Sequence, residues 1–200
     1  MNQPITVFFI GYSGCGKDTQ AGLLQKFLEK RDGLGSVLYI YTGDELRKFA
    51  EGSSYTAKKI KNDILEVGGK APDFLAIYAW AEVFNKNFKP EHHLLFSSSP
   101  RTAIEAQILD EAMGFYGREK VYPVFLNVSR EEAFSRLKKR GRSDDTDEVI
   151  RSRLDFFDRE VRPALEYYKT QIKNKLVDID GNPHDENKIH EDILKALALV

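Results

Sequence analysis

The sequence predicts an α/β fold organised around a parallel sheet. Short apolar runs, rich in β-branched and aromatic residues, alternate along the 200 residues with longer segments whose apolar residues recur at helical spacing. Strands of a parallel sheet are buried on both faces, so their sequences are continuously apolar. Strands that alternate with helices pair in parallel through right-handed crossovers. We therefore expect a single domain over residues 1–200, with helices on both faces of the sheet.

The first predicted unit is a strand from Ile5 to Ile10, a glycine-rich turn and a helix from Lys17 to Lys30. The turn contains the phosphate-binding pattern G-x-x-x-x-G-K, formed by Gly11, Gly16 and Lys17. Glycines adopt the positive φ angles that gather backbone N–H groups around a phosphate, and the start of a helix attracts anions. The pattern therefore predicts a P-loop in which Lys17 neutralises terminal phosphates. The alternative is a glycine turn that only joins a strand to a helix.

The two residues after Lys17 bear on metal binding. Asp18 stands where Ser or Thr usually follows the lysine, and Thr19 comes one place later. Hydroxyl and carboxylate oxygens are the ligands that Mg²⁺ prefers. Thr19 is the expected contact to Mg²⁺, and Asp18 is a second candidate.

The remaining elements follow from local signals. Ser129 with Glu132 forms a capping box that predicts the start of a helix. Asp73 is a candidate cap of another helix. Pro163 should interrupt a helix or begin one. Further strands are expected at Val37–Tyr41, Leu94–Ser97, Tyr122–Val128 and Leu176–Ile179. Further helices are expected at Glu45–Val67 with a break at Gly52-Ser53, after Asp73, at Ala103–Met113, after Ser129, through Ile150 and Phe157, and at Ile189–Leu199.

The composition excludes several classes of protein. Lysine and arginine total 30 against 31 for aspartate and glutamate, so no global positive charge favours nucleic acid or an anionic membrane as a partner. No leader pattern and no apolar run of ~18 residues is present, so we expect a cytoplasmic protein. Cys15 is the only cysteine, which excludes an internal disulfide, and we interpret it as a small loop residue rather than a reactive thiol. The four histidines lack metal-ligand spacing and are expected at the surface, whereas Trp80 is expected to pack.

Five motifs together make the chain resemble the adenylate kinase family of nucleoside monophosphate kinases, over essentially its whole length. They are G-Y-S-G-C-G-K-D-T-Q at Gly11–Gln20, T-G-D-E-L-R at Thr42–Arg47, G-G-K-A-P-D at Gly68–Asp73, S-P-R-T at Ser99–Thr102, and R-L-K-K-R-G-R-S-D-D with a later R-S-R between Arg136 and Arg153. The resemblance implies a P-loop three-layer α/β/α fold with a five-stranded parallel sheet. It divides the chain into a core (1–44, 73–139 and 146–200), a helical monophosphate-binding region (45–72) and a very short lid (140–145).

The resemblance also implies roles for individual residues. Arginine suits phosphoryl transfer because its planar guanidinium binds phosphate oxygens in bidentate fashion. The implied catalytic residues are Lys17, Arg101, Arg140, Arg142 and Arg153. ATP would be bound by Gly11, Ser13, Gly14, Cys15, Gly16, Lys17, Asp18, Thr19, Arg136 and Pro183. AMP would be bound by Thr42, Gly43, Arg47, Lys70, Ala71, Arg101, Glu105, Arg142 and Arg153. Mg²⁺ would be held by Thr19, with Asp44 and Ser97 acting through water, and Asp144 and Asp145 would orient the lid arginines rather than act as bases.

Three residues depart from the pattern of the family. Ser97 stands in place of an acidic residue that orients magnesium-bound water, and Asp18 replaces a glycine. Glu105 falls where the adenylate kinases have a glutamine that reads the acceptor base; a carboxylate only accepts hydrogen bonds, so it would also suit guanine. Gln107, two positions along, is an alternative reader of the base.

We therefore expect a monomeric kinase that moves the γ-phosphoryl group of Mg-ATP to AMP, giving two ADP. The alternatives are a kinase for another nucleoside monophosphate, such as GMP, CMP or UMP, which Glu105 suggests, and a nucleotide-binding regulatory protein with residual activity, which Ser97 and the short lid suggest.

Overall fold

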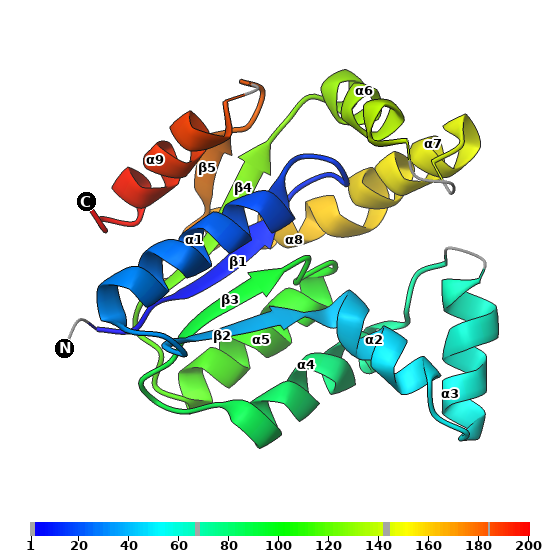
Figure 1. Cartoon of the computed structure of the whole chain (residues 1–200), viewed down its shortest axis with the longest axis horizontal. Helices are drawn as coiled ribbons and strands as arrows, with labels where there is room; N and C mark the ends of the chain where they lie inside the picture. The colour runs from blue at the N-terminus through cyan, green and yellow to red at the C-terminus, as the bar shows by residue number, and fades with distance from the viewer. Residues whose placement is uncertain (1–2, 67–68, 142–144, 184) are drawn as a thin grey trace.

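A computed structural model describes residues 3–66, 69–141, 145–183 and 185–200. Its centre is a five-stranded, all-parallel sheet with the strand order β2-β3-β1-β4-β5 (Figure 1). The strands are β1 (Thr6–Ile10), β2 (Val37–Tyr41), β3 (His93–Ser97), β4 (Val121–Asn127) and β5 (Val177–Asp180). All five predicted strands are confirmed, with ends that differ by at most one residue.

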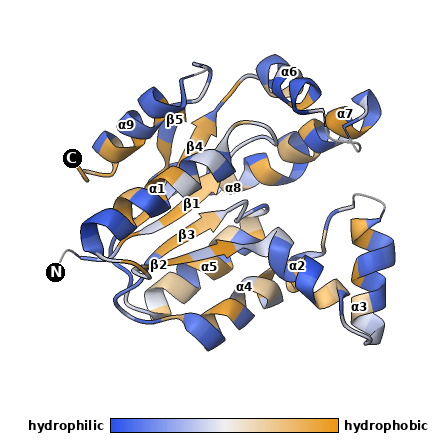
Figure 2. Ribbon diagram, in the orientation of Figure 1, coloured by the Kyte–Doolittle hydropathy of each residue, from blue (hydrophilic) through white to orange (hydrophobic). Residues whose placement is uncertain are grey.

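The central strands are apolar because helices cover both of their faces. Every residue of β1 is buried, and hydrophobic residues dominate the strands (Figure 2). Helices α1 (Lys17–Asp32) and α9 (Glu186–Ala196) lie on one face, and α4 (Asp73–Asn87), α5 (Ala103–Phe115) and α8 (Arg162–Thr170) lie on the other. Trp80 packs in the core as predicted. The structure is thus the expected three-layer α/β/α arrangement.

The segment after β2 forms a helical arm with its own small core. It contains α2 (Thr42–Ala50), α3 (Tyr55–Ile60) and the π-helical turn η1 (Lys61–Leu65). The apolar side chains of this arm pack with the start of α4 in a cluster of Leu46, Ile60, Ile64, Ala71, Leu75 and Ala79. The first helix begins at Thr42 rather than at Glu45, because it follows β2 without a connecting loop.

A second arm leads from β4 through α6 (Arg130–Arg140) and α7 (Asp147–Phe156), and continues without a gap through the π-helical turn η2 (Phe157–Val161) into α8. Ser129 is the predicted cap of α6, and its Oγ accepts a hydrogen bond from the Glu132 N–H over 3.2 Å. Pro163 stands in the first turn of α8, where proline is tolerated because no helical partner is needed for its missing N–H. The sequence predicts that Pro163 interrupts a helix or begins one; the helical structure is not interrupted there, and α8 begins one residue earlier, at Arg162.

Three local predictions are corrected. Asp73 is the first residue of α4 and not its cap, a position that Pro72 occupies. The last helix begins at Glu186, before the predicted Ile189, because Asp185 caps it by accepting from the N–H groups of Asn187 and Lys188. His93 is buried, against the expectation of a surface position, because it starts β3 and is enclosed beside β1. None of the described helices has the length and apolar character needed to cross a bilayer.

Candidate functional site

A cavity of about 810 Å³ opens at the carboxyl ends of β1, β2 and β3, and residues of the α2–η1 arm and of the α7–η2 segment line it. Open parallel sheets bind their ligands at this edge. Seven cationic and two anionic side chains line the cavity: Lys17, Arg47, Lys70, Arg101, Arg151, Arg153 and Arg159, with Glu148 and Asp155. The chain carries a net charge of −1, so this positive charge is a local concentration suited to polyanionic ligands.

The glycine-rich turn between β1 and α1 has the conformation expected of a phosphate cradle. Gly14 and Gly16 adopt φ angles of 83° and 99°, which favour glycine, and a Cβ on Gly14 would approach the Leu137 Cγ of α6 to 2.9 Å. Lys17 Nζ donates to the carbonyl oxygens of Gly11 and Tyr12, both over 2.8 Å. Gly11, Ser13 and Lys17 line the cavity. Cys15 is 1% exposed, so it is a packed loop residue and not an accessible thiol.

The predicted donor-side residues gather around the outer edge of this turn. Arg136 Nη2 donates to the carbonyl oxygens of Gly181 and Asn182, over 2.8 and 3.0 Å, and Nη1 reaches the Cys15 carbonyl over 3.5 Å. The guanidinium is held from behind by Glu132, at 2.8 Å from Nε. Arg136 therefore spans from the P-loop to the turn that contains Pro183.

Two of the arginines predicted for the lid share one buried carboxylate. Arg140 and Arg153 both donate to Asp145 Oδ1, over 2.8 and 2.6 Å, and Arg140 Nε donates to Oδ2 over 3.0 Å. The Asp145 side chain is only 1% exposed. Asp145 therefore orients these arginines, as predicted, and Arg153 faces the cavity. The predictions for Arg142 and Asp144 lie outside the described residues.

On the acceptor side, Arg47 and Arg101 enter the cavity from different elements. Arg47 pairs with Asp44 one turn away on α2, over 2.5 Å, and its guanidinium lies 5.5 Å from the centre of the Tyr41 ring. Arg101 follows β3, and its Nε donates over 2.9 Å to the carbonyl oxygen of Ser98, which has a left-handed φ of 75°.

The other predicted acceptor residues divide into lining and buried positions. Gly43, Lys70 and Ala71 line the cavity, and Lys70 Nζ lies 3.3 Å from Asp73 and 3.6 Å from Glu160 of η2. Lys70 thus links the two walls. Thr42 is 3% exposed and hydrogen-bonds with Ser99 over 2.8 Å, so it supports the Arg101 loop from beneath.

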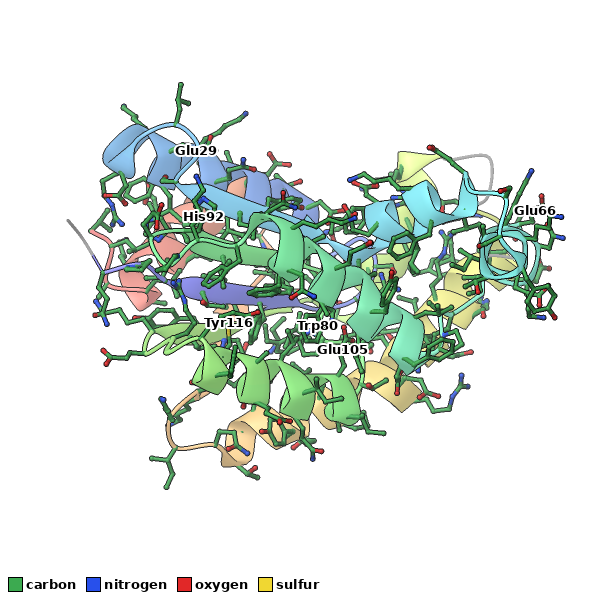
Figure 3. All side chains as sticks on the ribbon, turned by 90° about the horizontal axis from the view of Figure 1, so that it is seen from below. Glu29, Glu66, Trp80, His92, Glu105 and Tyr116 are labelled. Carbon is green, nitrogen blue, oxygen red and sulfur yellow. The ribbon has the colours of Figure 1, made fainter. Side chains whose placement is uncertain are left out.

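Glu105 does not line the cavity in the described part of the chain. It is 1% exposed and lies among the packed interior side chains (Figure 3). Thr102 caps α5 by accepting from the Glu105 N–H over 3.1 Å, while Glu105 Oε2 accepts from the Arg101 N–H over 2.6 Å. This is a reciprocal cap closely related to a capping box. Sequence inspection could have found it from the T-x-x-E spacing, which matches that of Ser129 and Glu132. Burial raises the pKa of Glu105 although hydrogen bonds from Arg101 and Ser99 oppose the increase.

Two of the four predicted metal contacts, Asp18 and Ser97, meet at the end of β3. Asp18 and Thr19 are exposed in the first turn of α1, Asp44 is exposed in the first turn of α2, and the buried Ser97 donates its hydroxyl hydrogen bond to Asp18 Oδ1. Among the described residues no three carboxylate, histidine or cysteine side chains form a complete metal cage. Mg²⁺ binds through one or two carboxylates together with phosphate oxygens and water, so these oxygen donors fit it.

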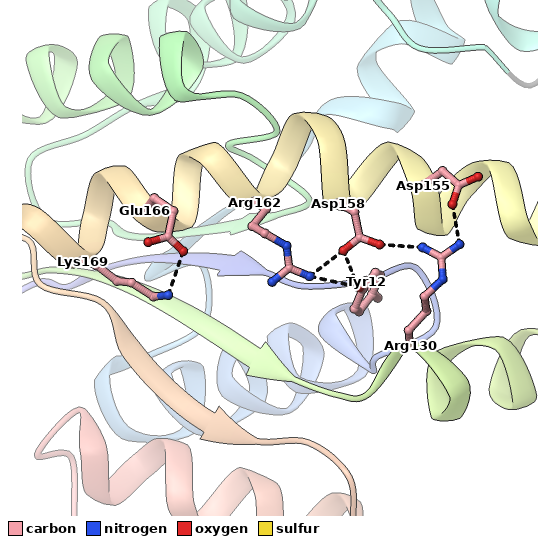
Figure 4. A network of polar contacts seen from close by, with 7 residues as sticks. All are labelled: Tyr12, Arg130, Asp155, Asp158, Arg162, Glu166 and Lys169. Carbon is pink, nitrogen blue, oxygen red and sulfur yellow. Dashed lines mark hydrogen bonds and ion pairs between the residues drawn. The ribbon is translucent and has the colours of Figure 1, made fainter.

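Two features of the site were missed in the sequence. Arg151 and Arg159 line the cavity beside Arg153. They are eight residues apart on continuous helical structure, a spacing that could have indicated that they lie on the same side of the helix. Tyr12, within the P-loop, donates to Asp158 of η2 over 2.6 Å, and Arg130 and Arg162 also bind that carboxylate (Figure 4). Partial burial raises the pKa of Asp158, but hydrogen bonds from Tyr12, Arg162 and Arg130 outweigh this effect. The pKa of Asp158 therefore lies below its ordinary value. No sequence motif joins these distant positions.

Comparisons with a family model and with individual proteins both find adenylate kinases. Residues 9–173 match the family model described as adenylate kinase. An adenylate kinase of Prochlorococcus marinus is 30% identical over 193 residues, covering 96% of this chain and 98% of the relative. One from Bacteroides fragilis is 32% identical over 197 residues with the same coverage, and one from Parabacteroides distasonis is 34% identical over 177 residues, covering 86% and 88%.

Proposed function

Because the chain belongs to the adenylate kinase family of phosphotransferases, we propose that it transfers the γ-phosphoryl group of Mg-ATP reversibly to AMP, giving two ADP. The observation that carries the proposal is the cavity itself, in which a P-loop faces cationic side chains from two separate arms. Phosphoryl transfer needs donor and acceptor aligned and charge on the phosphate oxygens stabilised. An arrangement with one cationic wall for each nucleotide supplies both.

The donor half would consist of the P-loop and the second arm. Lys17 is within reach of the terminal phosphates once its bonds to Gly11 and Tyr12 are exchanged for phosphate oxygens. Arg136 and Pro183 would flank the base. Arg140 and Arg153, pre-oriented by Asp145, would close on the phosphates, and Arg142 is proposed to join them.

The acceptor half would consist of Arg47, Lys70 and Arg101, with Gly43 and Ala71 as close-approach positions. Mg²⁺, when bound, would supply positive charge that offsets the charge on the phosphate oxygens. Thr19 is proposed to bind it directly, and Asp44 and Ser97 are proposed to bind it through water. Closure of the two walls would exclude water, which protects ATP from hydrolysis.

A substrate panel tests the proposal. Steady-state rates are measured with Mg-ATP and AMP, GMP, CMP, UMP or their deoxy forms, with Lys17→Met as the inactive control. We expect AMP to give the highest kcat/KM and Lys17→Met to lose about a thousandfold or more, as for other groups that stabilise transferring phosphates. Preference for another monophosphate would show a different specificity. Tight nucleotide binding without turnover would favour the regulatory alternative.

We also propose that the enzyme is a monomer in the cytoplasm. Its partners would be nucleotides, and it would bind neither nucleic acid nor a membrane. Light scattering after size-exclusion chromatography should give the mass of one chain, and a dimer mass would contradict this part.

A further inference from the structure

Two unusual residues of this site, 79 positions apart in the chain, bind each other. Ser97 ends β3, and its Oγ donates to Asp18 Oδ1 in the first turn of α1. Ser97 is fully buried, whereas Asp18 is exposed. The hydroxyl therefore fixes the direction of an exposed carboxylate beside the P-loop.

No cation neutralises this carboxylate in the described part of the chain. Lys17, its neighbour, donates instead to the carbonyl oxygens of Gly11 and Tyr12. Asp18 thus adds a negative charge at a helix start that is otherwise built to receive phosphate.

A second carboxylate acts on the same place. Burial raises the pKa of Tyr39; the Ser97 hydroxyl opposes that increase, and the charges of Asp18 and Asp44 add to it. Tyr39 and Ser97 lie on the paired strands β2 and β3. Ser97 and Asp18 therefore meet at the carboxyl edge of the sheet, and the charge of Asp44 acts on the neighbouring Tyr39.

Phosphate binding at this point creates an electrostatic conflict. Two negative charges held at contact distance repel each other. A divalent cation between carboxylate and phosphate turns the repulsion into attraction, and hard oxygen ligands of this kind select Mg²⁺. Asp18 should therefore weaken the binding of metal-free nucleotide and strengthen the binding of the magnesium complex.

We propose that Asp18 is the principal carboxylate that directs Mg²⁺ to the phosphates, and that Ser97 is a positioning residue that orients it. The inference rests on the proposed function, since it assigns the metal of Mg-ATP. The acid of this site is thus supplied by the helix after the P-loop, and the end of β3 contributes the hydroxyl that holds it.

The test is calorimetric binding of the β,γ-imido analogue of ATP, once with excess Mg²⁺ and once with EDTA. The wild type should bind the magnesium complex more tightly than the free analogue. In Asp18→Asn this ratio should fall by about 10- to 100-fold, the usual cost of losing an outer ligand of a metal, while the free analogue binds at least as tightly as to the wild type. If both affinities change by the same factor, or neither changes, the proposal is wrong.

Two further variants separate the charge from the fold of α1. Glu131→Gln removes an exposed acid from the first turn of α6 and should leave the ratio unchanged. Asp18→Asn combined with Ser97→Asp moves the carboxylate to the end of β3 and should recover the magnesium preference. Circular dichroism establishes that each variant is folded, and a folded double variant without recovery would contradict the proposal.

The outcomes distinguish this inference from the proposed function. If the wild type fails to phosphorylate AMP but Asp18→Asn loses the magnesium preference, only the proposed function fails. If the wild type phosphorylates AMP and Asp18→Asn keeps the full preference, only the inference fails.

Discussion

Glu105 places a carboxyl group inside the protein, directly behind Arg101, which lines the cavity. Its Oε2 accepts from the Arg101 N–H, and its Oε1 is a buried oxygen without a hydrogen-bond partner among the described residues. The side chain therefore acts on the loop that carries Arg101. A role as reader of the acceptor base would require the carboxylate to leave this position.

Glu105→Gln separates the two roles, because the amide oxygen can still accept from Arg101. If Glu105 only holds the loop, the ranking of nucleoside monophosphates stays that of the wild type. A tenfold or larger change in the AMP to GMP ratio of kcat/KM would instead support the base-reading role.

The same variant has a predicted effect on the pH dependence of stability. Because burial raises the pKa of Glu105 above 4.5, the folded protein holds this proton more tightly than the unfolded chain. The wild type therefore loses stability from this group as the pH rises through the window above 4.5, and Glu105→Gln abolishes that loss. Urea unfolding between pH 4 and 8 measures it. Glu111→Gln, an exposed carboxyl on the same helix, should change stability by less than about 0.5 kcal/mol at pH 7.

At the scale of elements, a polar network ties the P-loop to the second arm. Tyr12, Asp158 and Arg130 connect the turn after β1 with η2 and the first residue of α6, and Arg130 also binds Asp155 of α7 (Figure 4). The P-loop and the helices that carry Arg140 and Arg153 are therefore held in a fixed relative position, although they are distant in sequence.

Tyr12→Phe removes the hydroxyl from this network and keeps the ring, which packs 4.0 Å from the Phe157 ring. We expect a loss of about 1.5 to 3 kcal/mol in stability, typical of a hydrogen bond to a charged group, and a higher KM for ATP because the P-loop loses its tie to η2. Thermal unfolding and steady-state kinetics measure the two effects.

Tyr167→Phe is the matched control. Its hydroxyl donates to Asp110 over 3.0 Å, between α8 and α5, and neither residue lines the cavity. It should cost similar stability and leave the KM for ATP unchanged. Equal kinetic effects in both variants would contradict a positioning role for Tyr12.

At the scale of the whole molecule, His93 joins the sheet to the first helix. Its Nδ1 accepts from the Ile5 N–H of the chain entering β1, and its Nε2 lies 3.0 Å from Asp32 at the end of α1. The Nδ1 bond requires an unprotonated nitrogen. Burial lowers the pKa of His93, although Asp32 opposes the decrease.

Acidification should therefore lower the stability of the folded protein, because it protonates His93. Since its folded pKa lies below the ordinary value of 6.5, the unfolded chain binds more protons in the window just below 6.5. Stability from this group is complete above 6.5 and is lost as the pH falls through the folded pKa. His93→Gln, whose amide oxygen can accept from Ile5, should flatten this part of the unfolding curve. Parallel curves for variant and wild type would refute the prediction.

The sequence by itself determined the features that depend on neighbouring residues. Continuous apolar runs identified all five strands, the spacing of Gly11, Gly16 and Lys17 identified the P-loop, and Ser129 with Glu132 identified a helix start. These signals are local because strand burial, positive φ angles and caps each act within a few residues.

Only the tertiary structure decided the features that depend on distant residues. It brought Ser97 to Asp18, tied Tyr12 to Asp158, enclosed His93 and placed Arg151 and Arg159 at the cavity. It also placed Glu105 behind the cavity wall. The T-x-x-E spacing indicates the bond between Thr102 and Glu105 but not the bond between Arg101 and Glu105. The physical reason is that side-chain contacts across a sheet edge depend on how strands and helices pack, and no local periodicity encodes that packing.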